Sequence, residues 1–444
     1  MGGTAVKRAL AAALALLLAS GCAHGAARAL SSTAVSPVPS AQPSQTLWAG
    51  AARVEMTPPV GTPLAGYSRR HGAPSVGVET PLYARALALS DGRRVAVLVG
   101  CEALIIDEAL YDAVLARLQR RYRLARAGLL LWATHTHAGP GAYGHRFLEE
   151  LSMGRYDARV FDRLTQQIVE AASRAVAALA PSSVRGGEAI VEGASRNRMD
   201  DGGPVDPTVR ALRFDAASGA PLALLVTFAA HPTVLSAANR RFSGDYPGAL
   251  MAVVEAAHPG SVCLFAPGAI ADQAPVYGAG DRFVQARALG ARLAAAALAA
   301  TAPESAHASA PVTTLVDDLR LPPARLPWGR RRLPSWVSAR FVDRTARLHL
   351  VAVDGWLLIG VPCDLGVEVG RALGAAARAR GWRPMIIGFA DDYIGYVLPA
   401  AAYGRDTYES RMSFNGPAVA DALTRALTSM MDRLTAEPDH ATTR

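Results

Sequence analysis

Residues 129–143, LLLWATHTHAGPGAY, hold the pattern from which the rest of the chain is best understood. The segment opens with a continuous apolar run, which predicts a strand buried on both faces. His135 and His137 follow this run, and directly after them comes the sequence AGPG, which favours a turn. In an extended strand the two imidazoles project from the same face, about 6.6 Å apart. This spacing suits a metal ligand beside a second reactive group. The alternative interpretation is a strand end with two solvated histidines.

The same succession of apolar strand, polar residue and chain-breaking residue recurs further along. Residues 222–228 are a predicted strand that is followed by His231-Pro232. Asp364 likewise follows a predicted hairpin about Asp354-Gly355. A histidine before proline is more often structural than a ligand, so spacing alone leaves the role of His231 open. Because strands alternate with helices, we predict an α/β fold: a single layered domain with mixed β-sheets flanked by helices and a site at the carboxyl ends of strands.

Local patterns predict further elements. A second hairpin is expected about Asp91-Gly92, and Asp245 stands where the cap of a helix that ends near residue 257 is expected. Other helices are predicted at residues 105–121, 160–179, 281–300 and 417–436. Residues 301–345 are rich in proline and arginine and give no clear pattern. The thiols of Cys101, Cys263 and Cys363 are expected to be buried and free.

Composition indicates a globular protein with no nucleic-acid partner. Of the 444 residues 51% are hydrophobic and 19% charged. The net charge is +9, yet Lys7 is the only lysine, which favours a general arginine bias over a binding surface, and no basic stripe is visible. The densest run, residues 330–332 between Trp328 and Trp336, is interpreted as a solvated loop or as a contact for anionic lipid headgroups.

The first residues predict export. Lys7 and Arg8 precede an apolar run at residues 9–19 that is too short to span a bilayer, so residues 1–22 are predicted to be a signal peptide. The sequence ASGC before and at Cys22 resembles a bacterial lipoprotein cleavage site. Lipidation of Cys22 would tether the protein to a membrane surface, and ordinary cleavage nearby is the alternative. We expect a lipoprotein of the cell envelope, or otherwise a periplasmic or secreted protein.

Several motifs, taken in order, resemble the neutral, non-lysosomal ceramidases. Each is short, but their order over about residues 51–411 is specific. The motifs are MTPPVGTPLAGY (56–67), PLYARALAL (81–89), ATHTHAGPG (133–141), Asn197-Arg198, AAHPT around His231, SGDYPG (243–248), IADQAP (270–275), GVPCDLGVEVG (360–370) and YIGYVLP (393–399). The expected organisation is a flexible tether at 23–46, a ceramidase-like zinc hydrolase domain at 47–436 and a disordered tail at 437–444.

The resemblance implies a zinc site. The family holds Zn²⁺ by two histidines, a glutamate and a tyrosine, which implies His135, His231 and Tyr396 as ligands, with Asp364 at the place of the glutamate. His137, Arg198 and Tyr408 match further active-site positions. The implied reaction is hydrolysis of the N-acyl bond of ceramide or a related N-acyl lipid by a zinc-activated water.

Roles for the remaining residues follow from the same resemblance. A carboxylate or an imidazole near the metal is expected to accept the water proton, and His137 is expected to pass a proton to the leaving amine. Tyr408 and Arg198 are expected to hydrogen-bond the developing oxyanion.

The chain departs from the family pattern at three points. Asp364 is shorter than glutamate, so either the metal lies closer to this strand end or Glu368, one helical turn on, compensates. Ala274 replaces a common serine, which disfavours a serine mechanism. The immunoglobulin-like C-terminal domain of the full-length enzymes is not expected, so presentation of the substrate from a membrane is expected to differ. These departures leave a second function open: a catalytically weakened envelope lipoprotein that binds lipid or a partner.

Overall fold

The computed structural model describes residues 46–302, 306–328, 331–339 and 341–436. The predicted signal peptide, the tether up to residue 45, the lipidation site at Cys22 and the predicted tail lie outside these residues.

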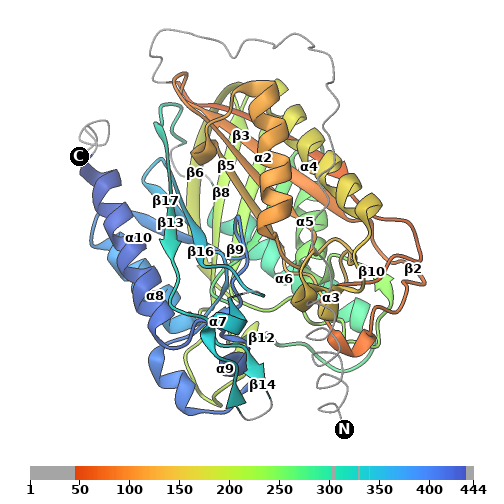
Figure 1. Ribbon diagram of the computed structural model, residues 1–444. Coiled ribbons are helices and arrows are strands. Elements are labelled where there is room, and N and C mark those ends of the chain that lie inside the picture. The colour runs from red at the N-terminus through yellow and green to blue at the C-terminus, as the bar shows by residue number, and fades with distance from the viewer. Residues whose placement is uncertain (1–45, 303–305, 329–330, 340, 437–444) are drawn as a thin grey trace.

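Two β-sheets stacked face to face form the centre of the molecule (Figure 1). The larger contains, in order across the sheet, β11 (Val262–Pro267), β9 (Pro221–Phe228), β8 (Thr208–Ala216), β6 (Ala180–Ile190), β1 (Trp48–Glu55), β3 (Tyr83–Ser90), β4 (Val95–Cys101) and β5 (Leu129–Ala133). The smaller contains β13 (Val312–Arg320), β16 (Thr345–Val353), β17 (Trp356–Gly360) and β19 (Arg383–Ile387). The pairs β11/β9, β4/β5 and β17/β19 are parallel and the other pairs within these two sheets are antiparallel, so both sheets are mixed.

Helices cover the outer face of each sheet. The larger sheet packs against α2 (Glu108–Tyr122), α4 (Ala158–Ala177), α5 (Asp245–Ala257) and α6 (Arg282–Ala300). The smaller sheet packs against α8 (Val367–Arg378) and α10 (Ala418–Ala436). Figure 1 shows the resulting order of layers: helix, sheet, sheet, helix. The predicted fold class is confirmed.

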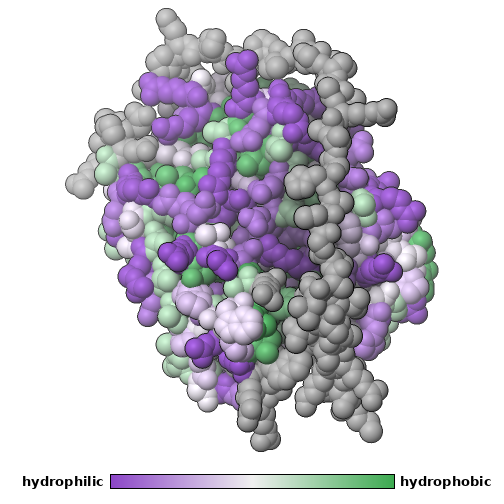
Figure 2. Space-filling view, in the orientation of Figure 1, coloured by the Kyte–Doolittle hydropathy of each residue, from purple (hydrophilic) through white to green (hydrophobic). Residues whose placement is uncertain are grey.

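Short elements connect these layers. They are η1 (Ser68–Arg70), β2 (Gly77–Val78), η2 (Arg126–Gly128), α3 (Phe147–Met153), β7 (Ser195–Asn197), β10 (Arg241–Phe242), β12 (Gln273–Pro275), β14 (Pro327–Trp328), β15 (Arg331–Arg332), α7 (Ser335–Ser338), β18 (Asp364–Leu365), β20 (Tyr396–Val397), η3 (Ala400–Gly404) and α9 (Tyr408–Met412). The face drawn in Figure 2 is mostly polar with small separate apolar areas, because most large apolar side chains lie between the layers.

The space between the sheets explains the apolar run at residues 129–133. All five residues of β5 are buried, because one face of the strand contacts the second sheet and the other contacts the helical layer. Trp132 and Trp356 are fully buried between the sheets, and the indole N–H of Trp132 donates to the Phe265 carbonyl at 2.8 Å. The carboxyl end of β5 is therefore held rigidly, which fixes the start of the histidine loop.

Two local predictions hold. The hairpins about Asp91-Gly92 and Asp354-Gly355 are confirmed as β3/β4 and β16/β17. The thiols of Cys101, Cys263 and Cys363 are buried and free.

Two other local predictions are wrong. Strand β5 ends at Ala133, and His135 has a left-handed backbone (φ 62°), so the two histidines do not alternate along one extended strand. Gly244, and not Asp245, is the N-cap of α5; the Asp245 carboxylate accepts instead from the Leu235 and Tyr246 N–H groups. The sequence predicted no element at residues 301–345, and this stretch contains β13, which pairs antiparallel with β16 along its whole length.

Candidate metal centre

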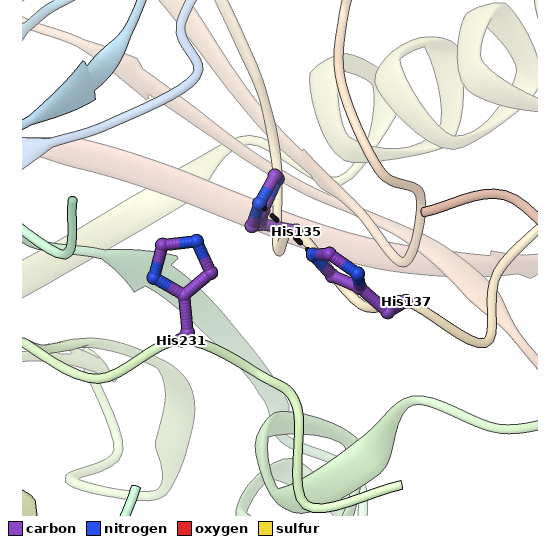
Figure 3. Close-up of side chains that lie close together, drawn as sticks. All are labelled: His135, His137 and His231. Atoms are coloured by element: carbon purple, nitrogen blue, oxygen red, sulfur yellow. Dashed lines mark hydrogen bonds between the residues drawn. The ribbon is translucent and has the colours of Figure 1, made fainter. Parts of the chain in front are cut away.

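Three histidines from two distant loops converge on one point (Figure 3). His135 and His137 follow β5, and His231 follows β9; one ring nitrogen of each lies within 4.8 Å of the others. The Nε2 atoms of His135 and His137 are 3.2 Å apart. The rings of His135 and His231 lie edge to face, with centroids 5.1 Å apart. The proximity expected of His135 and His137 is therefore present, although a turn and not an extended strand produces it.

Main-chain carbonyls orient two of the imidazoles. The Nδ1–H of His135 donates to the Leu104 carbonyl at 2.7 Å, and the Nδ1–H of His231 donates to the Ile270 carbonyl at 2.7 Å. Because a neutral imidazole has only one N–H, each Nε2 carries a lone pair. A carbonyl on one ring nitrogen and a free lone pair on the other is the usual arrangement of a metal-binding histidine.

Asp364 adds a carboxylate to the same point. Strand β18 pairs in parallel with β20, and this register sets Asp364 beside Tyr396. One carboxylate oxygen, Oδ2, accepts from the Tyr393 hydroxyl at 2.7 Å. The other, Oδ1, lies 3.2 Å from Nε2 of His231 and 3.8 Å from Nε2 of His135.

These atoms fit a bound cation. Among the described residues, Nε2 of His231 and Oδ1 of Asp364 are buried without a hydrogen-bond partner. A lone pair and a carboxylate oxygen that face each other in a buried site are unfavourable unless a positive charge lies between them. Two imidazole nitrogens and a carboxylate oxygen form a donor set that suits zinc.

Burial keeps the imidazoles neutral. It lowers the pKa of His135 to about 4, and it lowers the pKa values of His137 and His231 well below the usual value for histidine. Near neutral pH all three rings therefore offer lone pairs. Burial also raises the pKa of Asp364, while the neighbouring His135 and the Tyr393 hydrogen bond oppose that rise.

The structure distinguishes between the two carboxylates considered at this position. Asp364 is completely buried in the site, whereas Glu368 is exposed on the first turn of α8. Asp364, and not the exposed Glu368, is thus the carboxylate that faces the histidines. The pairing of β18 with β20 sets the main chain of Asp364 beside Tyr396, and from there its carboxylate lies close to the imidazoles of His135 and His231.

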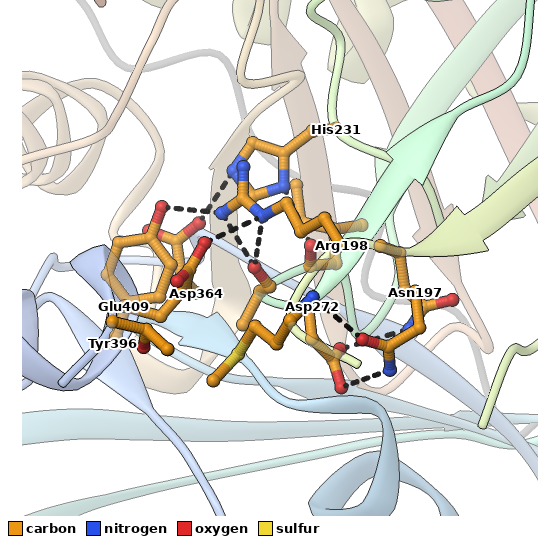
Figure 4. A network of polar contacts seen from close by, with 12 residues as sticks. Asn197, Arg198, His231, Asp272, Asp364, Tyr396 and Glu409 are labelled. Carbon is orange, nitrogen blue, oxygen red and sulfur yellow. Dashed lines mark hydrogen bonds and ion pairs between the residues drawn. The ribbon is translucent and has the colours of Figure 1, made fainter. Parts of the chain in front are cut away.

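Arg198 borders the site and is held from two sides (Figure 4). Its guanidinium donates Nε and Nη2 to the Ala271 carbonyl at 3.0 and 2.6 Å, and Nε lies 3.0 Å from Oε1 of Glu409. Nη2 also donates to the Tyr396 hydroxyl at 3.0 Å. The ring of Tyr396 lies nearly parallel to that of His231, with centroids 6.5 Å apart. Arg198 and Tyr396 therefore form a polar wall beside the histidines.

Asp272 supports that wall from behind. Its carboxylate accepts from the Asn197 side-chain amide at 3.3 Å and from the Val367 N–H at 3.0 Å (Figure 4). These bonds hold the loop whose Ile270 carbonyl orients His231. The loop after β11 is thus tied both to β7 and to the start of α8.

Tyr408 is the most exposed of the predicted site residues. It begins α9, its side chain is 61% exposed, and its ring meets that of Tyr396 edge to face at 5.9 Å. The structure therefore brings the seven predicted site residues into one region, with Tyr408 at the rim: His135, His137, Arg198, His231, Asp364, Tyr396 and Tyr408.

Sequence reasoning missed several contributors. Tyr393 holds Asp364, and Phe389 stacks on His135 with ring centroids 3.9 Å apart. Tyr393 lies in the YIGYVLP segment, so this motif already pointed to a residue near the site. The carbonyls of Leu104 and Ile270 had no such signal in the sequence, because every residue has a carbonyl.

Comparison with known proteins agrees with this geometry. The family model "Neutral/alkaline non-lysosomal ceramidase, N-terminal" matches residues 48–281. The chain is 30% identical to the neutral ceramidase of Pseudomonas aeruginosa over 192 residues, which is 39% of this chain and 28% of that protein. It is 30% identical to the neutral ceramidase of Mycobacterium tuberculosis over 193 residues, 39% of this chain and 30% of that protein.

A solved structure shares the fold. The crystal structure of neutral ceramidase from Pseudomonas aeruginosa superimposes with a TM-score of 0.79 and 22% sequence identity, covering 88% of this chain and 74% of that chain. The sequence matches to the two bacterial relatives span less than a third of their length. At these values the structural likeness shows the fold.

Proposed function

The chain belongs to the neutral/alkaline non-lysosomal ceramidase family, and from this premise we propose that it hydrolyses the N-acyl bond of ceramide or of a related N-acyl lipid. The observation that carries the proposal is the convergence of the His135 and His231 lone pairs with Oδ1 of Asp364, which has no hydrogen-bond partner among the described residues. We propose that these residues and Tyr396 hold Zn²⁺. Zinc supplies a Lewis acid for the amide carbonyl and lowers the pKa of bound water to about 7.

His137 is suited to moving a proton. Its ring is neutral, its Nδ1 is buried without a partner among the described residues, and its Nε2 faces the other histidines. A neutral imidazole within hydrogen-bond reach of a substrate nitrogen can take up the proton released by the attacking water, directly or from the group that first accepts it, and pass it to the leaving amine as the amide bond breaks. We propose this role for His137. The carboxylate of Asp364 or an imidazole accepts the proton of the attacking water.

Arg198 and Tyr408 are suited to binding the developing oxyanion. The Arg198 guanidinium is held in place by Glu409 and by the Ala271 carbonyl, so it needs little reorganisation when negative charge forms nearby. Tyr408 at the rim adds a hydroxyl donor from the solvent side. Both would stabilise the transition state more than the ground state.

The proposed location is the cell envelope, with lipidated Cys22 as the anchor. A lipid substrate in the same membrane would then be within reach. Metabolic labelling with radioactive palmitate tests the anchor: the wild-type chain should be labelled and Cys22→Ser should not. Equal labelling of both would contradict it.

Two measurements on the purified protein test the function. We expect stoichiometric zinc in the wild-type chain and hydrolysis of a fluorescent N-acylsphingosine, and loss of both in His135→Ala with an unchanged circular dichroism spectrum. His258→Ala is the matched control, because it removes an imidazole at the end of α5. Full zinc retention in His135→Ala would overturn the ligand assignment.

The remaining outcomes separate the alternatives. Zinc without ceramide hydrolysis would point to a different amide as substrate. Lipid binding with neither zinc nor hydrolysis would support the weakened envelope lipoprotein.

A further inference from the structure

His137 differs from the other two histidines in how its ring is held. His135 and His231 each donate Nδ1–H to a main-chain carbonyl, whereas Nδ1 of His137 has no hydrogen-bond partner among the described residues. A buried imidazole without such a bond can rotate unless packing prevents it. On the opposite side of the ring, Nε2 of His137 lies within hydrogen-bond distance of Nε2 of His135, at 3.2 Å. The residues that pack around the Nδ1 side therefore hold the ring in the position that allows this contact.

Residues 63–70 supply that packing. This segment lies against the turn that follows His137, and the Ala65 N–H donates to the Gly139 carbonyl at 3.2 Å. The pairing brings a stretch about seventy residues earlier in the chain directly onto the histidine loop.

Arg70 ties three loops together from within this segment. Its buried guanidinium donates to the carbonyls of Ala65 at 2.8 Å, His137 at 2.6 Å, and Ser236 and Ala237 at 3.3 Å each. Among the described residues all of its hydrogen-bond acceptors are main-chain carbonyls. Burying a cation without a carboxylate is costly, and an apolar side chain would fill the space more cheaply. Only arginine has several N–H donors on one rigid planar group, so only arginine can bind these carbonyls together.

Gly66 and Tyr67 enclose the ring itself. The rings of Tyr67 and His137 lie 4.7 Å apart at 56°, and the Tyr67 hydroxyl donates to the Leu235 carbonyl at 3.1 Å. Gly66 has φ 105°, and a Cβ there would lie 2.6 Å from Cγ and Nδ1 of His137. Only glycine allows this close approach.

We propose that Gly66, Tyr67 and Arg70 are positioning residues that hold the His137 imidazole with Nε2 directed at the other histidines. The inference rests on the proposed function for its catalytic consequence, but the orientation itself can be measured without activity.

Gly66→Ala and Gly61→Ala form a matched pair. Both glycines have nearly the same backbone angle, φ 105° and 104°, but a Cβ at Gly61 would meet no atom of the described residues within 4 Å. Both variants therefore place alanine at the same unfavourable φ, and only the first displaces His137. We expect kcat to fall about 100-fold in Gly66→Ala, with KM and zinc content unchanged, and wild-type kcat in Gly61→Ala. Equal losses in the two variants, or a loss confined to KM or zinc, would overturn the proposal.

Arg70→Gln and Arg69→Gln form a second pair. Arg69 is the exposed neighbour, so both variants lose one positive charge but only Arg70→Gln loses the clamp. We expect kcat to fall in Arg70→Gln and not in Arg69→Gln. Arg70→Lys should recover only part of the loss, because an ammonium group cannot reach four carbonyls. Full recovery by lysine would show that charge alone matters and would refute the clamp.

NMR of the protein with isotope-labelled histidine reports the environment of the His137 imidazole without any substrate. The His137 imidazole signal, assigned from His137→Ala, should shift or broaden in Gly66→Ala and stay unchanged in Gly61→Ala. If Gly66→Ala does not fold, Tyr67→Phe serves in its place, because it keeps the ring and removes only the bond to Leu235. An altered signal in a protein that hydrolyses no N-acyl lipid would support the positioning and refute the proposed function. An unaltered signal in an active protein would refute the positioning.

Discussion

Replacing Tyr393 by phenylalanine removes one hydroxyl that contacts the candidate metal centre. That hydroxyl donates to Oδ2 of Asp364 at 2.7 Å, and Asp364 is completely buried. The bond leaves Oδ1 free to face the histidines. Phenylalanine fills nearly the same volume, so the change isolates the hydrogen bond.

The size of the effect follows from the charge of the acceptor. A hydrogen bond to a charged group contributes about 1.5–3 kcal/mol, and each 1.4 kcal/mol is a factor of about ten in affinity. Zinc affinity should therefore fall about 10- to 150-fold in Tyr393→Phe, close to the range of about 10- to 100-fold typical for a lost partner of a metal ligand. The loss appears in zinc binding because a bound cation needs the ionised carboxylate that the hydroxyl stabilises.

Competition with a chromophoric chelator measures the zinc dissociation constant. Tyr111→Phe is the matched control: its hydroxyl donates to the Leu129 carbonyl at 3.1 Å, outside the metal site. We expect weaker binding in Tyr393→Phe and unchanged binding in Tyr111→Phe. An unchanged dissociation constant in a folded Tyr393→Phe protein would refute the argument that Asp364 holds the metal in the orientation seen here.

Three further predictions concern stability and reactivity. Trp132→Ala should lower the free energy of unfolding by about 3–5 kcal/mol, measured in urea, because the indole is fully buried between the sheets; a loss below about 1 kcal/mol would contradict that packing. Burial raises the pKa of Asp392 to about 8, so its contribution to stability is complete below the unfolded pKa of about 3.9 and is lost as the pH rises through about 8. The free energy of unfolding of the wild-type protein should therefore fall as the pH rises between these two pKa values, and Asp392→Asn should reduce that fall. The same pH profile in both proteins would contradict the raised pKa of Asp392. Burial also raises the pKa values of the described thiols, so a disulfide reagent should modify Cys101, Cys263 and Cys363 only after unfolding, and fast labelling of the native protein would contradict this.

The sequence alone determined the local features of this protein. The apolar run at residues 129–133 predicted β5, and the two Asp-Gly pairs predicted their hairpins, because burial and turn geometry leave a pattern in neighbouring residues. The order of short motifs also identified the candidate site residues. These inferences needed no knowledge of which strands pair.

Tertiary structure decided how those residues meet. The pairing of β18 with β20 sets Asp364 beside Tyr396, whereas Glu368 lies exposed on the first turn of α8. Strand β13, for which no element was predicted, pairs with β16 along its whole length, and this pairing joins residues that are more than twenty positions apart in the chain.

The orientation of the site is likewise a property of the folded chain. The carbonyls that orient His135 and His231 belong to Leu104 and Ile270, and the fork that holds the His137 loop belongs to Arg70. A carbonyl is present at every position, so no residue type marks the ones that accept these bonds. Only the packing of distant segments selects them, because hydrogen bonding depends on position in space and not on distance along the chain.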